Sequence, residues 1–194
     1  MKHHLIYVTG LGDQRVKGQQ RLLSVYPLFG IEAELYQMNW ADGESFTAKR
    51  DRLLTLIDKR THEGKTVSLI GISAGAAAVV NTYVERSTAI HRVVYVCGKL
   101  RGSVNPSYFM ENPAFYETMQ ILPKSLARLT VTDKAKMQSH YAIADPVVPA
   151  PCTKIDGVSC ALIPMVGHAA SIVTDVVILS PRIVCFIKHR SDGL

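Results

Sequence analysis

The chain has 194 residues, of which 47% are hydrophobic and 20% are charged. This balance is typical of a chain that folds around an apolar core, and it excludes a disordered, collagen-like or coiled-coil protein. The length fits a single domain over residues 1–194, since no stretch has the composition of a linker.

The basic residues indicate a charged surface rather than a nucleic-acid site. Lysine and arginine number 22 against 16 acidic residues, a formal net charge of +6. They are spread in short groups without interleaved aromatic residues, so we expect no nucleic-acid partner.

Three further features bear on where the protein works. No segment reaches the roughly 18 apolar residues of a membrane span, because the best candidate, residues 172–187, is interrupted by Asp175, Pro181 and Arg182. The first residues do not resemble a signal peptide. The 4 cysteines form no C-x-x-C pair and are interpreted as buried or incidental thiols. We therefore expect a cytoplasmic protein without a membrane span.

Segments rich in β-branched residues alternate with segments of helical periodicity along most of the chain. This alternation is typical of an α/β protein with a mostly parallel sheet. In chain order it predicts a strand over 5–9, a helix over 14–28, a strand over 31–38, a helix over 45–60, a strand over 67–72, a helix over 74–85, a strand over 91–97, an insertion over 98–128 with a helix from Pro113 to about residue 121, strands over 137–144 and 159–164, and a terminal helix over 168–188 bent at Pro181.

The insertion is dense in apolar and aromatic residues. It forms either a small cap, in which Tyr108, Phe109 and Phe115 line an apolar substrate pocket, or a helix packed for stability. Trp40, which follows the second predicted strand, either lines the same cleft or anchors the sheet edge.

The strand over 67–72 runs directly into Gly71-Ile-Ser73-Ala-Gly75, a G-x-S-x-G pattern followed by an alanine-rich helix. A serine hydroxyl is a poor nucleophile unless it is held at an exposed point beside a base, and a sharp strand-to-helix turn provides such a point. The helix also directs unpaired N–H groups toward a developing oxyanion. The alternative is a tight turn used only for packing.

With this motif the sequence resembles the α/β-hydrolase superfamily over nearly the whole chain. The resemblance implies a minimal member that lacks the first two strands of the full fold, with a doubly wound, mostly parallel sheet of about six strands in the order 2-1-3-4-5-6. It also implies that the acid and the histidine follow the nucleophile in the chain. Asp145, after the strand over 137–144, and His168, after the strand over 159–164, look like the family's acid and histidine loops. The implied roles are Ser73 as nucleophile, His168 as base and Asp145 as the acid that orients it.

Other acids and histidines have simpler interpretations. Asp133 fits a solvated loop and Asp156 fits a turn, and Asp145 itself precedes a proline, as turn-opening residues often do. Only Asp145 lies at the carboxyl end of a strand, where open α/β sheets place their sites. His140 lies within a strand and is expected to be packed or hydrogen-bonded there, and the remaining histidines apart from His168 are interpreted as surface residues.

Residues 9–12 read Thr-Gly-Leu-Gly and look like the family's first-strand loop, with threonine in place of the usual histidine. We expect the backbone N–H groups of Leu11 and Ala74 to form an oxyanion hole, and Gly10 to contact substrate. A G-x-G segment also fits a dinucleotide loop, but Arg15 stands where the next glycine is required.

The sequence therefore predicts a serine hydrolase that cleaves a carboxylic ester or thioester through an acyl-serine intermediate. An amide or peptide hydrolase using the same residues and a catalytically silent binding or scaffold protein are the alternatives. A scaffold has no reason to retain Ser73, Asp145 and His168 together. We expect no organic cofactor and no metal, since His3-His4 is only a pair. The expected partner is a small-molecule ester, and the pattern does not indicate an oligomeric state.

Overall fold

A parallel sheet forms the centre of the computed structural model, which describes residues 2–13, 16–103 and 106–189. Its strands are β1 (His3–Val8), β2 (Ile31–Tyr36), β3 (Thr66–Ile72), β4 (Ile90–Val96), β5 (Met137–Ala144) and β6 (Ser159–Val166). They pair in the order β2-β1-β3-β4-β5-β6, and every pair is parallel. The predicted α/β class and strand order are confirmed.

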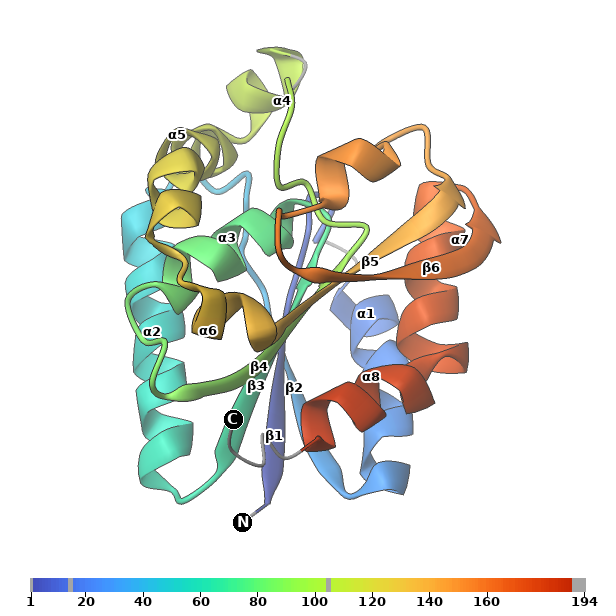
Figure 1. Ribbon diagram of the computed structural model, residues 1–194. Coiled ribbons are helices and arrows are strands. Elements are labelled where there is room, and N and C mark those ends of the chain that lie inside the picture. Colours follow the sequence, from blue (N-terminus) through green and yellow to red (C-terminus); the bar gives the residue numbers. More distant parts are fainter. Residues whose placement is uncertain (1, 14–15, 104–105, 190–194) are drawn as a thin grey trace.

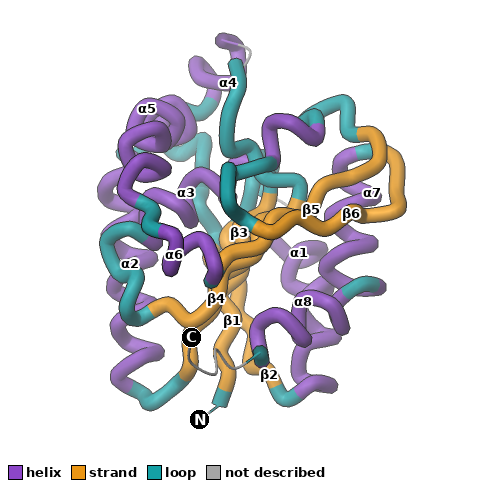
Figure 2. Tube along the Cα trace, viewed as in Figure 1, coloured by secondary structure: helices purple, strands orange, loops and turns teal. Residues whose placement is uncertain are grey.

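Helices cover both faces of this sheet (Figures 1 and 2). On one side lie α2 (Phe46–His62), α3 (Ala74–Tyr83), α5 (Pro113–Arg128) and α6 (Val131–Ala135), and on the other lie α1 (Val16–Leu22), α7 (His168–Val173) and α8 (Ser180–Lys188). The other helical segments are the 3-10 helix η1 (Leu23–Phe29), α4 (Pro106–Glu111), the 3-10 helix η2 (Ala150–Thr153) and the π-helical segment η3 (Thr174–Ile178).

Each face of the sheet packs into its own apolar core. Successive side chains of a strand point to opposite faces, so in β1 Ile6 and Val8 join the core under α2 and α3, whereas Leu5 and Tyr7 join the core under α8 and η1. Helices on both sides also explain why β3 is a nearly continuous apolar run, as parallel strands covered on both faces are.

Before the terminal helix, the helices predicted over 14–28 and from Pro113 to about residue 121 differ most from the structure in their bounds. The helix predicted over 14–28 is divided into α1 and η1, which contains Pro27 and ends at Gly30 in the left-handed region; positions 14–15 lie outside the described residues. The helix predicted to end near residue 121 continues through Pro123 to Arg128. Its buried side chains include Leu122 and Ser125, so packing against α3 outweighs the local effect of the proline.

The short helix α6 was not expected, and Asp133 is not the solvated loop residue that the sequence suggested. Thr130 and Asp133 form a capping box at the start of α6, and the Asp133 carboxylate also accepts a hydrogen bond from the Tyr83 hydroxyl at 2.8 Å. These bonds hold the pKa of Asp133 below its usual range although burial opposes ionisation.

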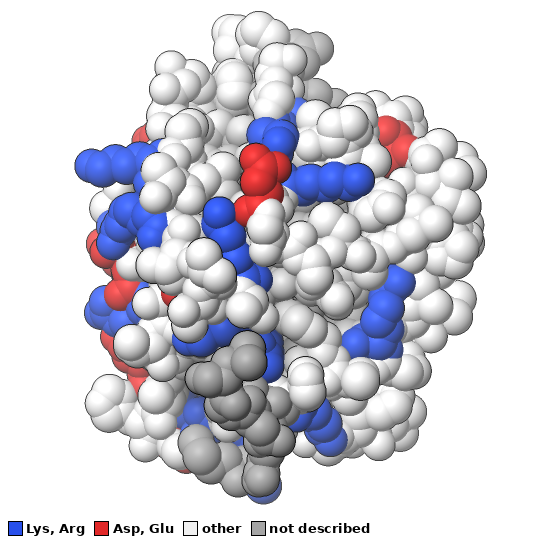
Figure 3. Space-filling view, viewed as in Figure 1, with Lys and Arg blue, Asp and Glu red and all other residues white. Residues whose placement is uncertain are grey.

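The terminal helix is broken at Leu179, between η3 and α8 and before Pro181, and the parts His168–Ile178 and Ser180–Lys188 are bent by 59°. Among the described residues, no single helix has both the length and the hydropathy to cross a membrane, and only the bent pair His168–Ile178 and Ser180–Lys188 meets that test jointly. On the face shown in Figure 3, lysine and arginine side chains lie in several separate groups.

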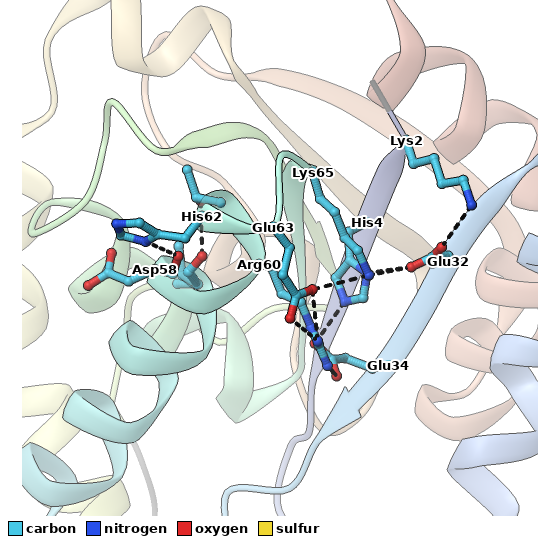
Figure 4. A network of polar contacts seen from close by, with 11 residues as sticks. Lys2, His4, Glu32, Glu34, Asp58, Arg60, His62, Glu63 and Lys65 are labelled. Carbon is cyan, nitrogen blue, oxygen red and sulfur yellow. Dashed lines mark hydrogen bonds and ion pairs between the residues drawn. The ribbon is translucent and has the colours of Figure 1, made fainter.

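A network of charged side chains joins the amino ends of β1 and β2 to α2 (Figure 4). Arg60 donates to the Glu34 carboxylate at 2.9 and 2.6 Å, the His4 ring lies 2.7 Å from the same group, and Lys65 donates to Glu32 at 2.5 Å. His4 is buried, contrary to the surface position expected, because β1 lies between β2 and β3. Although burial opposes ionisation, the bonds from Arg60 and His4 hold the pKa of Glu34 below its usual range.

We expect Glu34→Gln to lower the free energy of unfolding at pH 7 by about 1 kcal/mol, because a carboxylate with charged hydrogen-bond partners is lost. Since the pKa is lowered in the folded state, this stabilisation exists above the unfolded-state pKa and is lost as the pH falls through the lowered folded-state value. Urea unfolding across the acidic range should show that the difference in free energy of unfolding between the wild type and Glu34→Gln becomes smaller toward low pH. The control is Glu85→Gln, which removes a more exposed ion pair with Arg128. A difference between the wild type and Glu34→Gln that has the same size at every pH would contradict the interpretation.

Candidate active site

Ser73 occupies the turn between β3 and α3 with a φ of 51° and a ψ of −119°. A non-glycine residue adopts this conformation only where its surroundings hold it there. The Ser73 N–H donates to the Val96 carbonyl at 3.1 Å, and the Ser73 carbonyl accepts from the N–H groups of Lys99 at 2.9 Å and Ala76 at 3.1 Å. The serine is therefore fixed by the end of β4 on one side and by its own helix on the other.

Two glycines allow the backbone around Ser73 to pack closely. A Cβ atom at Gly75 would lie 2.5 Å from the Val8 carbonyl oxygen, and one at Gly10 would lie 2.8 Å from the Ser73 Cβ. Because no real Cβ atom tolerates such distances, only glycine lets α3 approach β1 and lets the loop after β1 reach the serine.

Ser73, His168 and Asp145 converge at the carboxyl edge of the sheet. His168 Nε2 lies 2.9 Å from Ser73 Oγ, and His168 Nδ1 lies 2.6 Å from Asp145 Oδ2. The other carboxylate oxygen, Oδ1, accepts from the N–H groups of Val147 and Val148, both at 2.9 Å. A hydroxyl, an imidazole and a buried carboxylate in this line can move the serine proton to the imidazole and stabilise the resulting charge.

The ends of neighbouring strands position the histidine and the acid. Asp145 follows β5 directly, and His168 is the first residue of α7, one residue after β6. The intervening Gly167 has a φ of 93° and donates its N–H to the Ala144 carbonyl at 2.8 Å, which ties the two loops together.

The competing acids and histidines lie elsewhere. Asp156 is exposed in its turn and pairs with an arginine at 3.0 Å. His140 is fully buried within β5 and hydrogen-bonded, as expected, with Nδ1 2.6 Å from Asp175 Oδ2. Arg182 donates to the other oxygen of Asp175, so this second histidine–carboxylate pair fastens η3 and α8 to β5 rather than facing Ser73.

Two cavities meet at Ser73 and His168. The first, of about 640 Å³, lies between the loop after β1, α1 and α7. The second, of about 510 Å³, lies between the acid loop, α5 and the segment after β4. Besides Ser73 and His168, the first is lined by Tyr7, Gly10, Leu11, Gly12, Gly18, Gln19, Leu22, Ile72, Ala169, Ile172 and Val173, and the second by Leu11, Gly12, Ala74, Lys99, Ser103, Phe115, Pro146, Val147 and Val148.

The backbone groups expected to form an oxyanion hole border the second cavity. Leu11 and Ala74 both line it beside Ser73. Ala74 is the first residue of α3, so its N–H has no acceptor within the helix. Leu11 follows Gly10, the residue whose missing side chain lets this loop approach Ser73.

The residues expected to bind substrate lie in different places. Gly10 lines the first cavity and Phe115 the second, whereas Phe109 lines neither and packs its ring 5.8 Å from that of Phe115. The side chain of Tyr108 lies outside the described part of the chain. Trp40 is buried, donates from Nε1 to the Thr9 carbonyl at 3.1 Å and packs edge-on against Phe115, so it anchors the first-strand loop.

Two residues near the site were missed in the sequence, Cys97 and Lys99. Burial, together with the nearby charge of Asp145, raises the pKa of the Cys97 thiol to about 12. Potential ligand atoms of Cys97, Asp145 and His168 lie within 4.8 Å of one another, a cluster the sequence did not suggest. Within this cluster Asp145 and His168 bond each other, so it overlaps the hydrogen-bonded line that ends at Ser73. The position of Cys97 and Lys99 in the sequence could have indicated both residues, since they follow β4 at the sheet edge that carries Ser73.

No protein-family model and no curated protein matches this sequence. Solved structures do match. A structure from the pair of metagenome-derived lipolytic enzymes LipS and LipT is 12% identical with a TM-score of 0.71, covering 96% of this chain and 94% of that chain. A serine hydrolase involved in carbazole degradation is 14% identical with a TM-score of 0.66, covering 97% and 92%. An alpha/beta hydrolase enzyme from the sediment metagenome of the Mar Chica lagoon, Morocco, is 14% identical with a TM-score of 0.64, covering 94% and 89%.

Proposed function

Because this chain has the α/β-hydrolase fold, we propose that it is a serine hydrolase that cleaves carboxylic esters or thioesters through an acyl-serine intermediate. One observation carries this assignment: the hydrogen-bonded line from Ser73 through His168 to Asp145, at a strained turn that opens into two cavities. Fold alone would support many activities, whereas this line supports nucleophilic attack by a hydroxyl.

In the proposed reaction, Ser73 Oγ attacks the carbonyl carbon while His168 Nε2 takes the hydroxyl proton. The carbonyl oxygen gains a negative charge, which the N–H groups of Leu11 and Ala74 stabilise. Asp145 stabilises the imidazolium, which then protonates the departing alcohol or thiol. A water molecule, activated by His168, next releases the acid from Ser73 and restores the enzyme.

The two cavities suit the two sides of a small ester. The first cavity is largely apolar. In this proposal α4 and α5 act as a small cap, and Phe115 of α5 covers the second cavity. Small-molecule esters are therefore the proposed substrates.

The test is hydrolysis of 4-nitrophenyl esters by the wild type and by Ser73→Ala. We expect the substitution to lower kcat by about 10,000-fold or more, because it removes the nucleophile and leaves only binding and the oxyanion hole. Ser24→Ala, at an exposed serine in η1 whose hydroxyl donates to the Arg21 carbonyl, is the matched control and should retain full activity. A folded wild type without turnover, or a Ser73→Ala variant as active as the control, would instead support the scaffold interpretation.

A further inference from the structure

We propose that Lys99 recognises a carboxylate on the substrate, so that the preferred esters carry a negative charge on one side of the scissile bond. This inference rests on the proposed function, because it concerns the cavity beside Ser73. It deepens that function by naming a substrate class, the monoesters of dicarboxylic acids or the esters of hydroxy acids.

Lys99 has a fixed position next to the nucleophile. Its backbone N–H donates to the Ser73 carbonyl at 2.9 Å, and the residue lines the second cavity together with Ser73 and His168. The residue is only 9% exposed. No acidic side chain lines this cavity among the described residues, so an anion entering it meets a lysine without a competing carboxylate.

The loop after β4 folds around the lysine side chain. Leu100 and Arg101 both donate their N–H groups to the Cys152 carbonyl, at 2.9 and 3.2 Å. This brings Gly102 so close that a Cβ there would lie 3.0 Å from Cys152 Sγ and 3.5 Å from Lys99 Nζ. The ammonium is therefore held in place before any ligand arrives, which reduces the entropy lost on binding.

The partner of the Lys99 ammonium is a neutral one. Nζ donates to the Ser103 carbonyl at 2.7 Å, and Lys99 takes part in none of the ion pairs formed by the described residues. An ammonium group has three N–H donors, and within the described ranges only the Ser103 carbonyl accepts one of them, which leaves two for a ligand. A buried cation with one carbonyl partner is poorly compensated, and a carboxylate supplies the missing charge.

Lys49 shows how a buried lysine with a structural role looks in the same molecule. Its Nζ is fully buried and lies 2.5 Å from Asp42 Oδ1 and 3.6 Å from Glu44 Oε2, and it also donates to the Asn39 carbonyl at 2.9 Å. Lys49 thus has its counter-ions inside the fold. Among the described residues Lys99 has no counter-ion, and it lines a cavity, which distinguishes a binding group from a structural one.

The two cavities also differ in character. In the part of the chain that the structure describes, no lysine, arginine or acid lines the first cavity, whereas Lys99 lines the second. A substrate that spans both therefore has an apolar group on one side of Ser73 and a carboxylate on the other.

The first experiment compares matched esters that differ only in charge. Mono-4-nitrophenyl glutarate is paired with its neutral methyl ester, which places the charge on the acyl side, and 3-acetoxybenzoate is paired with methyl 3-acetoxybenzoate, which places it on the alcohol side. We expect the wild type to favour the anionic member of one pair by about 10- to 100-fold in kcat/KM, mainly through KM. Lys99→Met should reduce that ratio to near 1, and Lys99→Arg should restore part of it.

The control for a general loss of positive charge is Lys124→Met, at an exposed position on α5, which should leave the ratio unchanged. A lysine that served only to hold the loop through the Ser103 carbonyl would alter both members of a pair equally. Equal ratios in the wild type and Lys99→Met, in an enzyme that turns over both esters, would overturn the inference while leaving the hydrolase intact.

A binding measurement separates the two proposals. Calorimetric titration of mono-4-nitrophenyl glutarate and of 3-acetoxybenzoate into Ser73→Ala, and into the same variant with Lys99→Met, does not depend on catalysis. We expect about 10-fold or greater weakening of one of these ligands when Lys99 is replaced. If the wild type hydrolyses no ester but the replacement of Lys99 weakens binding of one ligand, the carboxylate site is supported and the hydrolase proposal fails. Unchanged binding of both ligands would overturn the site.

Discussion

Replacing Asp145 by asparagine is expected to lower kcat/KM for ester hydrolysis by about 10,000-fold at neutral pH. In the folded protein, Asp145 Oδ1 accepts from the N–H groups of Val147 and Val148 and Oδ2 faces His168 Nδ1. The asparagine carbonyl will take the place of Oδ1, so its NH2 group faces Nδ1. His168 must then accept there and carry its proton on Nε2, which can no longer accept the proton of Ser73.

This result separates a catalytic role from a structural one. The Asp145→Asn variant retains the shape and both backbone hydrogen bonds of the acid loop, so its melting temperature should remain within a few degrees of the wild type. The matched control is Asp156→Asn, at an exposed carboxylate that pairs with Arg101, and it should have full activity. An Asp145→Asn enzyme with a tenth or more of the wild-type activity would argue against Asp145 as the orienting acid.

The largest expected effect on stability is that of Gly75→Ala. The added Cβ would lie 2.5 Å from the Val8 carbonyl oxygen and 2.6 Å from that of Thr9. Both are backbone atoms of the central part of the sheet and its first loop, so relief requires α3 to move away from β1. We expect a loss of about 3 kcal/mol or more in the free energy of unfolding.

Gly18→Ala is the matched control for this experiment. Gly18 lies in α1, and nothing lies within 4 Å of the Cβ it would gain. Alanine favours helix over glycine, so this variant should be as stable as the wild type or more stable by up to about 1 kcal/mol. Urea unfolding of both variants checks the pair, and equal stabilities would contradict the close approach of α3 to β1.

The parts of this protein that sequence reasoning predicted are those encoded by local patterns. The G-x-S-x-G turn combines a buried strand, a strained residue and a helix in one short segment, so Ser73 is visible without knowledge of any distant contact. Asp145 and His168 were found because each follows a strand, and parallel strands bring their carboxyl ends to one edge of the sheet.

What sequence reasoning missed depends on contacts between distant segments. The helix α5 continues through Pro123 because its buried face packs on α3, which no local rule reveals. His4 was placed on the surface because it precedes the strand predicted over 5–9, whereas β1 begins at His3 and pairs with β2 and β3 there. Lys99 gains its position from the loop around Cys152, some fifty residues later in the chain.

Mass spectrometry after treatment of the native protein with a fluorophosphonate tests most directly whether Ser73 is an activated nucleophile. The geometry of Ser73, His168 and Asp145 predicts a single covalent adduct on the wild type, located by peptide mapping at Ser73 and absent from Ser73→Ala. A folded wild type that gains no adduct, or an adduct of equal yield on Ser73→Ala, would contradict it.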